Sequence, residues 1–175
     1  MNIAALETLL ANLAELLMTP VLICIVLLLI YAVYAIGLFA GMYLMRRKSA
    51  LQYIRDINQQ DCQWHAGYPI HNYFVKNPSA CENELEIFAL KQLETLRVVT
   101  RVAPMLGLIA TMVPMGPALK ALADGNIQGI SESLIIAFAS VIWGLVIATL
   151  TFWPASVKKR WYASELINIR KLREV

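Results

Sequence analysis

Charge is scarce in this chain, and it is missing where a membrane proton carrier would need it. Only 15% of the 175 residues are charged, whereas 59% are hydrophobic. A soluble domain of this size could not bury so much apolar surface. The long apolar runs hold no Asp, Lys, Arg or His at mid-depth. A self-contained proton pump normally needs a titratable relay inside the membrane, so any proton carrier is expected on a partner.

Recognisable catalytic chemistry is also missing. The sequence contains no nucleophile–base pair, no phosphate-binding loop and no internal repeat, so we expect neither an enzyme nor a cofactor. Paired histidines within the apolar runs, which would hold haem, do not occur. The start of the chain lacks the basic region and small-residue cleavage site of a signal peptide. We therefore expect the first apolar run to remain in the mature protein.

Cysteine and histidine are few, and all of them except Cys24 lie in one part of the chain, at Cys62, His65, His71 and Cys81. These side chains are of the types that bind zinc. The spacing is loose, and no second Cys-x-x-Cys pair accompanies it. Reduced thiols and surface histidines are the simpler interpretation, so no metal site is predicted and zinc stays an open alternative.

Three apolar stretches are long enough to cross a bilayer of about 30 Å as helices, which predicts an all-α integral membrane protein. They are Val21–Met45, Val102–Leu119 and Leu134–Val157. Basic residues cluster after the first, before the second and after the third. Placing these clusters in the cytoplasm leaves only Lys120, of 15 basic residues, outside. The N-terminus is then outside and the C-terminus cytoplasmic. Topology explains the net charge of +3, so no nucleic-acid partner is predicted.

The predicted organisation has seven segments. They are an outer surface helix (1–18), transmembrane helix 1 (19–45), a cytoplasmic helical loop (46–97), transmembrane helix 2 (98–121), an outer turn (122–130), transmembrane helix 3 (131–157) and a cytoplasmic tail (158–175). Pro20 fits the first turn of the first span. Within the loop, 61–78 is predicted to be irregular. Ser79 and Glu82 have capping-box spacing, which predicts the start of a second helix in the loop. No proline occurs from Glu82 until Pro104, so this helix is predicted to continue unbroken into the second span.

Thr111 is the most informative residue of the second span. A hydroxyl buried at mid-membrane must find a partner, so it marks a packed interface or an ion path. Pro114 and Pro117 remove backbone donors nearby, which a membrane tolerates only against protein or a wet cavity. The second span should therefore face protein or water.

Small residues recur at spacings of three or four on one face of each of these two spans. They are Ala103, Gly107, Ala110, Pro114, Pro117 and Ala121 in the second span, and Ser133, Ala137, Ser140, Gly144, Ala148, Thr151 and Ala155 in the third. Such faces either pack closely or line a narrow lumen. From periodicity alone, ordinary helix packing is the simpler interpretation.

Two motifs and their order resemble the MotA/TolQ/ExbB proton-channel family. The stretch Ala103-Pro-Met-Leu-Gly-Leu-Ile-Ala-Thr111 is similar to the family's Ala-Pro-x-x-Gly-Leu-x-Gly-Thr, with Ala110 in place of a glycine. Ile130-Ser-Glu-Ser-Leu-Ile135 is similar to its Ile-Ala-Glu-Ala-Leu-Ile. Gly144-Leu145 followed by Pro154 matches the close of its third helix. The match covers about 101–154.

The resemblance implies a homo-oligomeric ring, a pentamer, in the cell (cytoplasmic or inner) membrane. The second and third helices would line a central lumen. That lumen would hold the single transmembrane helices of a partner with a membrane Asp and an outer domain. The Asp would carry a proton or a sodium ion, and ion flow would do mechanical work at the cell envelope. A non-conducting scaffold of the same fold and a small transporter remain as alternatives.

The same resemblance assigns candidate residues. Those of the ion path are Thr111, Ser140, Glu132 and Ser133; those packing the pore face are Gly107, Ala110, Pro114, Ala137 and Gly144. The family usually has a threonine shortly after its glutamate. Counting from Glu132 reaches Ala137, and counting back from Gly144 reaches Val141, so Ser140 is the nearest hydroxyl. Glu132 is predicted to serve gating or ion entry; a helix N-terminus would also favour an acid there.

Overall fold

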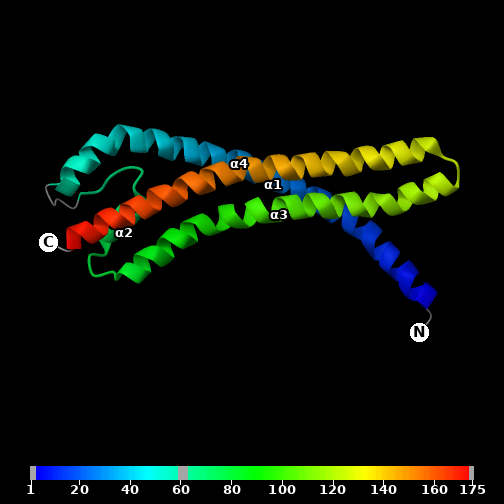
Figure 1. The fold of residues 1–175 in the computed structure, drawn as a ribbon, viewed down its shortest axis with the longest axis horizontal. Coiled ribbons are helices and arrows are strands. Elements are labelled where there is room, and N and C mark those ends of the chain that lie inside the picture. The colour runs from blue at the N-terminus through cyan, green and yellow to red at the C-terminus, as the bar shows by residue number, and fades with distance from the viewer. Residues whose placement is uncertain (1–2, 59–62, 174–175) are drawn as a thin grey trace. The chain divides into compact units, whose positions relative to one another are not determined.

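Four helices make up the part of the chain that the computed structural model describes, residues 3–58 and 63–173 (Figure 1). They are α1 (Ile3–Asn58), α2 (Pro69–Lys76), α3 (Glu82–Ala123) and α4 (Ile127–Arg173). No strand occurs among the described residues. The prediction of an all-α protein is confirmed.

Three of these helices are long and apolar enough to cross a membrane. The helices α1, α3 and α4 contain 56, 42 and 47 residues. At about 1.5 Å per residue, each exceeds the roughly 30 Å of a bilayer core. Their most apolar windows have mean hydropathies of 2.9, 1.6 and 2.4. Each helix is therefore longer than a single membrane crossing requires.

Several segments that were predicted to be separate belong to one helix. The helix α1 passes through Pro20 and continues past Met45 to Asn58, and α4 includes most of the predicted tail. The predicted continuity from Glu82 into the second span is confirmed, because α3 runs unbroken through three prolines. A proline removes one backbone hydrogen bond, and the neighbouring turns of a long helix keep theirs.

The loop between α1 and α3 is more ordered than predicted. The segment 61–78 contains α2, which begins at Pro69, a position where the missing N–H costs nothing. The helix α3 begins at Glu82, but the predicted capping box is wrong. The Cys81 N–H donates to Glu84 Oε2 at 3.1 Å, while Glu82 pairs with Arg170. Cys81 is therefore the residue that caps α3. The residue three positions later, whose side chain bonds back to the cap, is Glu84.

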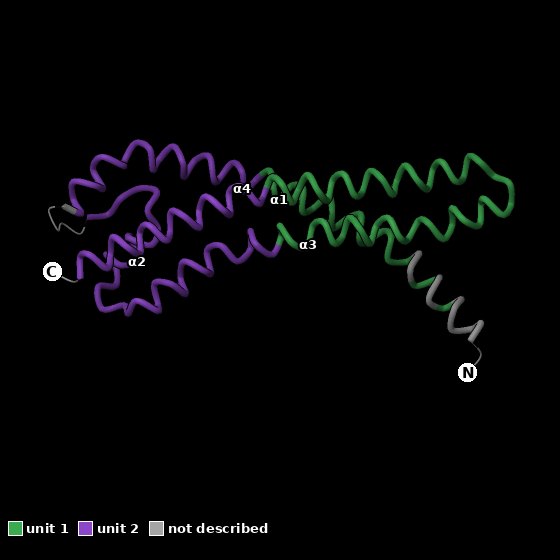
Figure 2. Tube along the Cα trace, in the orientation of Figure 1, with its two compact units in different colours: residues 1–33, 99–150 green, residues 34–98, 151–175 purple. Residues whose placement is uncertain are grey.

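The described chain divides into two compact units, coloured in Figure 2. The first contains residues 1–33 and 99–150. Its core joins α1 to α3 and α4 through Val21, Ile25, Ala32, Val99, Ala103, Ala110 and Ile147. Many other large apolar side chains of this unit, such as Leu27, Met112 and Ile142, are exposed. So much apolar surface requires lipid or protein to cover it.

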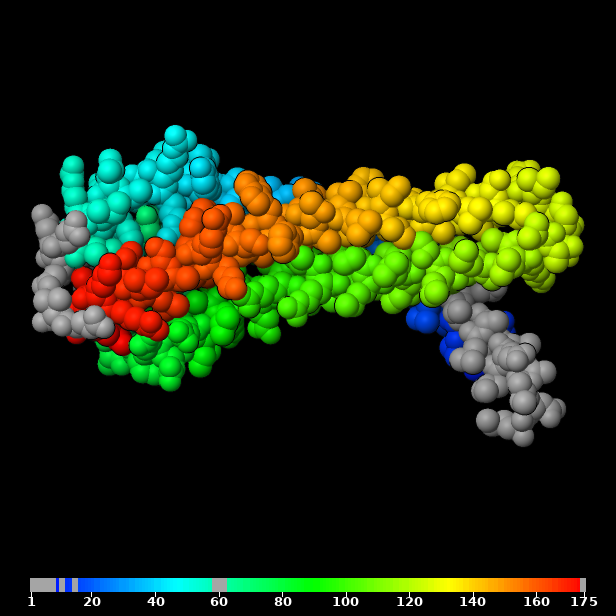
Figure 3. All heavy atoms as spheres, in the orientation of Figure 1, coloured from blue at the N-terminus to red at the C-terminus, as the bar shows by residue number. Residues whose placement is uncertain are grey.

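Within this unit, α3 and α4 lie side by side (Figure 3) and approach most closely at two glycines. A Cβ at Gly144 would lie 2.8 Å from the Ala103 carbonyl oxygen and 3.2 Å from the Gly107 Cα. A Cβ at Gly107 would lie 3.3 Å from the Ser140 carbonyl oxygen. These neighbours are backbone atoms, which cannot rotate away. The small-residue faces of the two spans therefore allow direct backbone contact.

Replacing Gly144 with alanine should destabilise the protein by about 1–3 kcal/mol, because the two helices must separate to admit one methyl group. Gly116→Ala is the matched control on α3, since a Cβ there meets nothing within 4 Å. Alanine at that site should be neutral or slightly stabilising. Thermal unfolding of the purified protein in detergent measures both. Equal midpoints would contradict the packing argument.

The connection between α3 and α4 is shorter than the predicted outer turn 122–130, because the helices extend to Ala123 and from Ile127. Gly125 has φ +71°, a conformation that favours glycine. The Asn126 N–H donates to the Ala121 carbonyl oxygen at 2.9 Å, which closes α3. Asn126 Oδ1 then accepts from the Gly129 N–H at 3.1 Å and caps α4.

The second unit contains residues 34–98 and 151–175. Its core packs α2 against α3 and α4 through Ile70, Phe74, Leu85, Ala89, Leu93, Tyr162 and Ile169. Aromatic rings join α1 to α4 within the same unit. Phe39 lies 5.4 Å from both Trp153 and Trp161, centroid to centroid, and Tyr43 lies 6.1 Å from Trp161. Such aromatic clusters are common where a membrane meets water.

Candidate functional site

Thr111 lies in the middle of the apolar part of α3 with its side chain partly exposed. Its Oγ1 donates to the Leu108 carbonyl oxygen at 2.7 Å. This bond satisfies the hydroxyl proton within the helix, as is usual for threonine in apolar helices. The lone pairs of the oxygen remain free to accept a bond from water or from a protonated group. Thr111 can therefore present a polar acceptor on the surface of α3.

Ser140 occupies a different environment, although it was predicted for the same path. Its side chain is buried, and its Oγ donates to the Ile136 carbonyl oxygen at 2.8 Å. Its backbone faces Gly107 across the α3–α4 contact. In the single chain, Ser140 packs between two helices and has almost no accessible surface.

Glu132 and Ser133 lie at the start of α4. Glu132 is exposed, and its Oε1 accepts from Gln128 Nε2 at 3.1 Å. Ser133 is half-buried, and its Oγ donates to the Gly129 carbonyl oxygen at 3.0 Å. The carboxylate is therefore accessible and close to the positive end of the helix dipole.

The five residues predicted to pack the pore face are all buried in the chain, and they occur on α3 and α4 alone. They are Gly107, Ala110, Pro114, Ala137 and Gly144. The two glycines among them form the closest α3–α4 approach. Packing within one chain accounts for their burial. Lining of a lumen stays a prediction.

The second unit contains a buried ion pair that was not predicted from the sequence. Glu165 of α4 is fully buried, and its Oε1 lies 2.6 Å from Arg46 Nη1 of α1. Its Oε2 accepts from the backbone N–H groups of Ile70 and His71, at 2.9 and 3.2 Å. One carboxylate therefore pairs with α1 and caps the first turn of α2.

Several surrounding groups hold the Arg46 guanidinium in place. Arg46 Nη1 also donates to the Gly67 carbonyl oxygen at 3.3 Å. The guanidinium carbon lies 4.2 Å from the Tyr68 ring centroid and 4.8 Å from that of Trp161. Burial raises the pKa of Glu165, while Arg46 and the two backbone N–H groups oppose that shift. No local sequence pattern predicts this ion pair, because Arg46 and Glu165 lie 119 positions apart in the chain.

The two histidines of the possible zinc site come together in this unit. The rings of His65 and His71 have centroids 5.8 Å apart. His71 Nε2 lies 3.1 Å from the Gln63 carbonyl oxygen, so this nitrogen carries the proton. Burial lowers the pKa of His71, which favours the neutral ring. His65 Nε2 lies 3.0 Å from Asp56 Oδ2.

No group of three potential metal ligands occurs among residues 3–58 and 63–173. Cys62 lies outside the described residues, and Cys81 is an exposed free cysteine. In the described chain the histidines pack on aromatic rings, with Tyr53 edge-on to both at 5.6 and 5.2 Å. In the described part of the chain, His65 and His71 therefore have a packing role.

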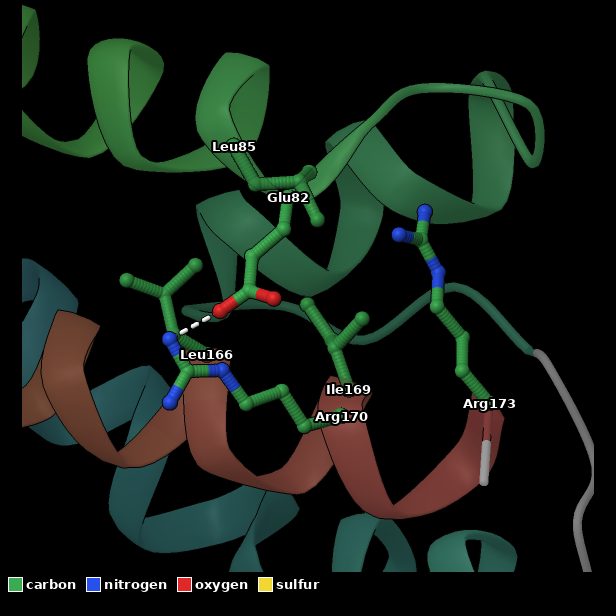
Figure 4. Close-up of a pocket in the computed structure, with 6 residues that line it drawn as sticks. All are labelled: Glu82, Leu85, Leu166, Ile169, Arg170 and Arg173. Carbon is green, nitrogen blue, oxygen red and sulfur yellow. Dashed lines mark ion pairs between the residues drawn. The ribbon is translucent and has the colours of Figure 1, made fainter. Parts of the chain in front are cut away.

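A second group of charges lines a cavity of about 120 Å³ between α3 and α4 in the same unit (Figure 4). Arg170 pairs with Glu82, and its Nη2 lies 3.6 Å from Glu86 Oε1. Arg173 donates to the Ala80 carbonyl oxygen. Both arginines therefore have partners among the described residues. The side chains of Arg170 and Glu82 are about half exposed, unlike those of the Arg46–Glu165 pair.

The helices and their apolar surfaces define a multi-pass membrane protein. Residues 77–171 match the MotA/TolQ/ExbB proton channel family, which is more than half of the 175 residues. The chain belongs to this family, as the motifs in the two spans predicted. No curated protein and no solved structure matches the chain. Members of the family are transport proteins, which form oligomeric channels with partner proteins.

Proposed function

We propose that this chain forms the ring of an ion-driven motor in the cell membrane. Five copies would surround a lumen with their α3 and α4 helices. The lumen would hold single transmembrane helices of a partner, whose Asp takes up and releases the proton or sodium ion. Ion flow would move the ring relative to the partner and so perform mechanical work at the cell envelope.

The observation that carries this proposal is that no Asp, Glu, Lys, Arg or His lies in the middle of the apolar spans of a channel-family protein. A proton crossing the membrane needs a group that binds and releases it. The partly exposed Thr111 hydroxyl can solvate such an exchange but cannot titrate in the accessible range. A carboxylate on a partner supplies what this chain lacks.

The buried small residues have a supporting part in this proposal. The contact at Gly107 and Gly144 would fix α3 against α4 within each copy. Thr111 lies beside this contact and keeps accessible surface, so it is better placed for the lumen than Ser140.

The decisive experiment reconstitutes the full chain in liposomes with and without a single-span partner that carries a membrane Asp. We expect dissipation of an imposed ion gradient only with both proteins, and loss of flux when the partner's Asp is replaced by Asn. Native mass spectrometry should give five copies per ring. Assembly of both proteins without flux would contradict the channel and support a scaffold of the same fold.

Glu132 is proposed to attract ions at the outer entrance, since its carboxylate is exposed at the start of α4. Replacing it with glutamine keeps the size and removes the charge. We expect a flux reduction of about fivefold, because one charge near the entrance contributes roughly 1 kcal/mol. The matched control is Asp124→Asn, which removes an exposed acid from the adjacent turn. Full flux in the Glu132 variant would leave only a helix-dipole role.

A further inference from the structure

A groove of about 360 Å³ opens beside α1 in the second unit. Gly37, Leu38, Gly41 and Met45 of α1 form one wall, and Tyr68 and Pro69 form the other. The groove exists because the glycines have no side chains: a Cβ at either one would meet nothing within 4 Å. Its volume is within the range of about 300–1,000 Å³ that is usual for small-molecule sites. Its lining is mostly apolar, and Asn72 is its polar side chain.

The groove lies where the apolar part of α1 ends. Arg46, Arg47 and Lys48 follow directly after Met45. On α1 at the same level, Phe39 and Tyr43 join the aromatic cluster with α4. Aromatic rings followed by basic residues are typical of the boundary between acyl chains and headgroups. An occupant of the groove would therefore have its apolar part beside the glycines and its polar part beside the basic residues.

Lys48 extends the groove face toward the cytoplasmic side. It is seven residues after Gly41, which is two helical turns, so the two residues share one face of α1. Lys48 is exposed and forms no ion pair with any residue in 3–58 or 63–173. Arg47, also exposed, points about 100° away around the helix. Arg46 is already paired with Glu165.

We propose that this groove is a binding site for an anionic phospholipid, with an acyl chain over Gly37 and Gly41 and the phosphate at Lys48. The apolar wall fits the acyl chain, and the Lys48 ammonium, which has no ion-pair partner among the described residues, complements the phosphate. The site belongs to this chain and does not depend on ion conduction.

The test is native mass spectrometry of the full-length protein, purified in detergent and supplied with phosphatidylglycerol or phosphatidylcholine. We expect phosphatidylglycerol to be retained preferentially. Lys48→Gln should reduce that preference about fivefold, the factor for one basic residue at an anionic surface, whereas Arg47→Gln should leave it nearly unchanged. Equal losses in the two variants would mean a non-specific basic surface and would overturn the proposal.

Filling the groove provides the second arm. Gly41→Leu should lower retention of both lipids without changing charge, whereas Ala40→Leu, at an exposed neighbouring position off the groove face, should not. Because a side chain at Gly41 meets open space, the variant is expected to fold, which circular dichroism checks. If Gly41→Leu instead reduces the number of copies per assembly and leaves lipid retention intact, the groove is a contact between subunits and the lipid site is wrong.

Discussion

Replacing Thr111 with valine should stop partner-dependent ion flow while the ring still assembles. Valine keeps the β-branched shape and removes only the hydroxyl, which donates to the Leu108 carbonyl oxygen. The stability cost should be small, because even the hydrogen bonds that join two transmembrane helices average only about 0.6 kcal/mol, and this bond lies within one helix. Flux should fall by about tenfold or more, since loss of a group that solvates the moving ion raises the barrier by about 1.4 kcal/mol or more.

Thr149 supplies the matched control for this variant. It is exposed on α4, and its Oγ1 donates to the Leu145 carbonyl oxygen at 2.9 Å, the same kind of bond within the helix. Thr149→Val should conduct normally. Thr111→Ser should retain part of the flux, because it keeps the hydroxyl and loses the methyl. If Thr111→Val conducts like the unmodified complex in liposomes, Thr111 only packs, and the ion path lies elsewhere.

Replacing Glu165 with alanine should destabilise the second unit by about 3–5 kcal/mol. The substitution leaves the Arg46 guanidinium, only 12% exposed, without its carboxylate. It also removes the acceptor from the N–H groups of Ile70 and His71 at the start of α2. Thermal unfolding of the full protein in detergent can be monitored by protease cleavage between α1 and α3. The temperature at which cleavage begins should be markedly lower in this variant.

Glu82→Ala is the control, because Glu82 makes the corresponding α3–α4 ion pair with Arg170 at the surface (Figure 4). Exposed pairs contribute about 0–1 kcal/mol, so its unfolding temperature should barely move. The double variant Arg46→Met with Glu165→Met should recover much of the loss, since no unpaired charge stays buried. Similar shifts for Glu165→Ala and Glu82→Ala would show that the buried pair contributes no more to stability than the exposed pair.

Local patterns carried much of the prediction. The spans were recognisable because a long apolar run leaves few alternatives to a membrane helix. The continuity of α3 from the loop into the second span was also predictable, because no proline occurs between Glu82 and Pro104. The Thr111 and Glu132 motifs predicted the family, because both stretches are short and continuous in sequence. The predicted cap of α3, Ser79, was wrong. Ser79 with Glu82 and Cys81 with Glu84 have the same spacing, and only the backbone geometry distinguishes the two pairs.

The buried site of the second unit could not be predicted in this way. Arg46 belongs to a basic cluster that indicates only topology, and Glu165 lies in a basic tail with no motif around it. Their pairing depends on α1 and α4 approaching each other, which no local spacing encodes. The helix α2 depends on the same contact, because an eight-residue helix is marginal by itself and here receives its cap from α4.

The sequence by itself determined that the protein is helical, crosses the membrane and belongs to a channel family, because hydropathy, charge bias and short motifs are properties of neighbouring residues. Only the tertiary structure decided which hydroxyl keeps accessible surface and which is buried. Thr111 and Ser140 look alike in the sequence, but the backbone contact at Gly107 and Gly144 buries Ser140 and leaves Thr111 partly exposed. That difference arises from how two helices pack, which depends on residues far apart in the chain.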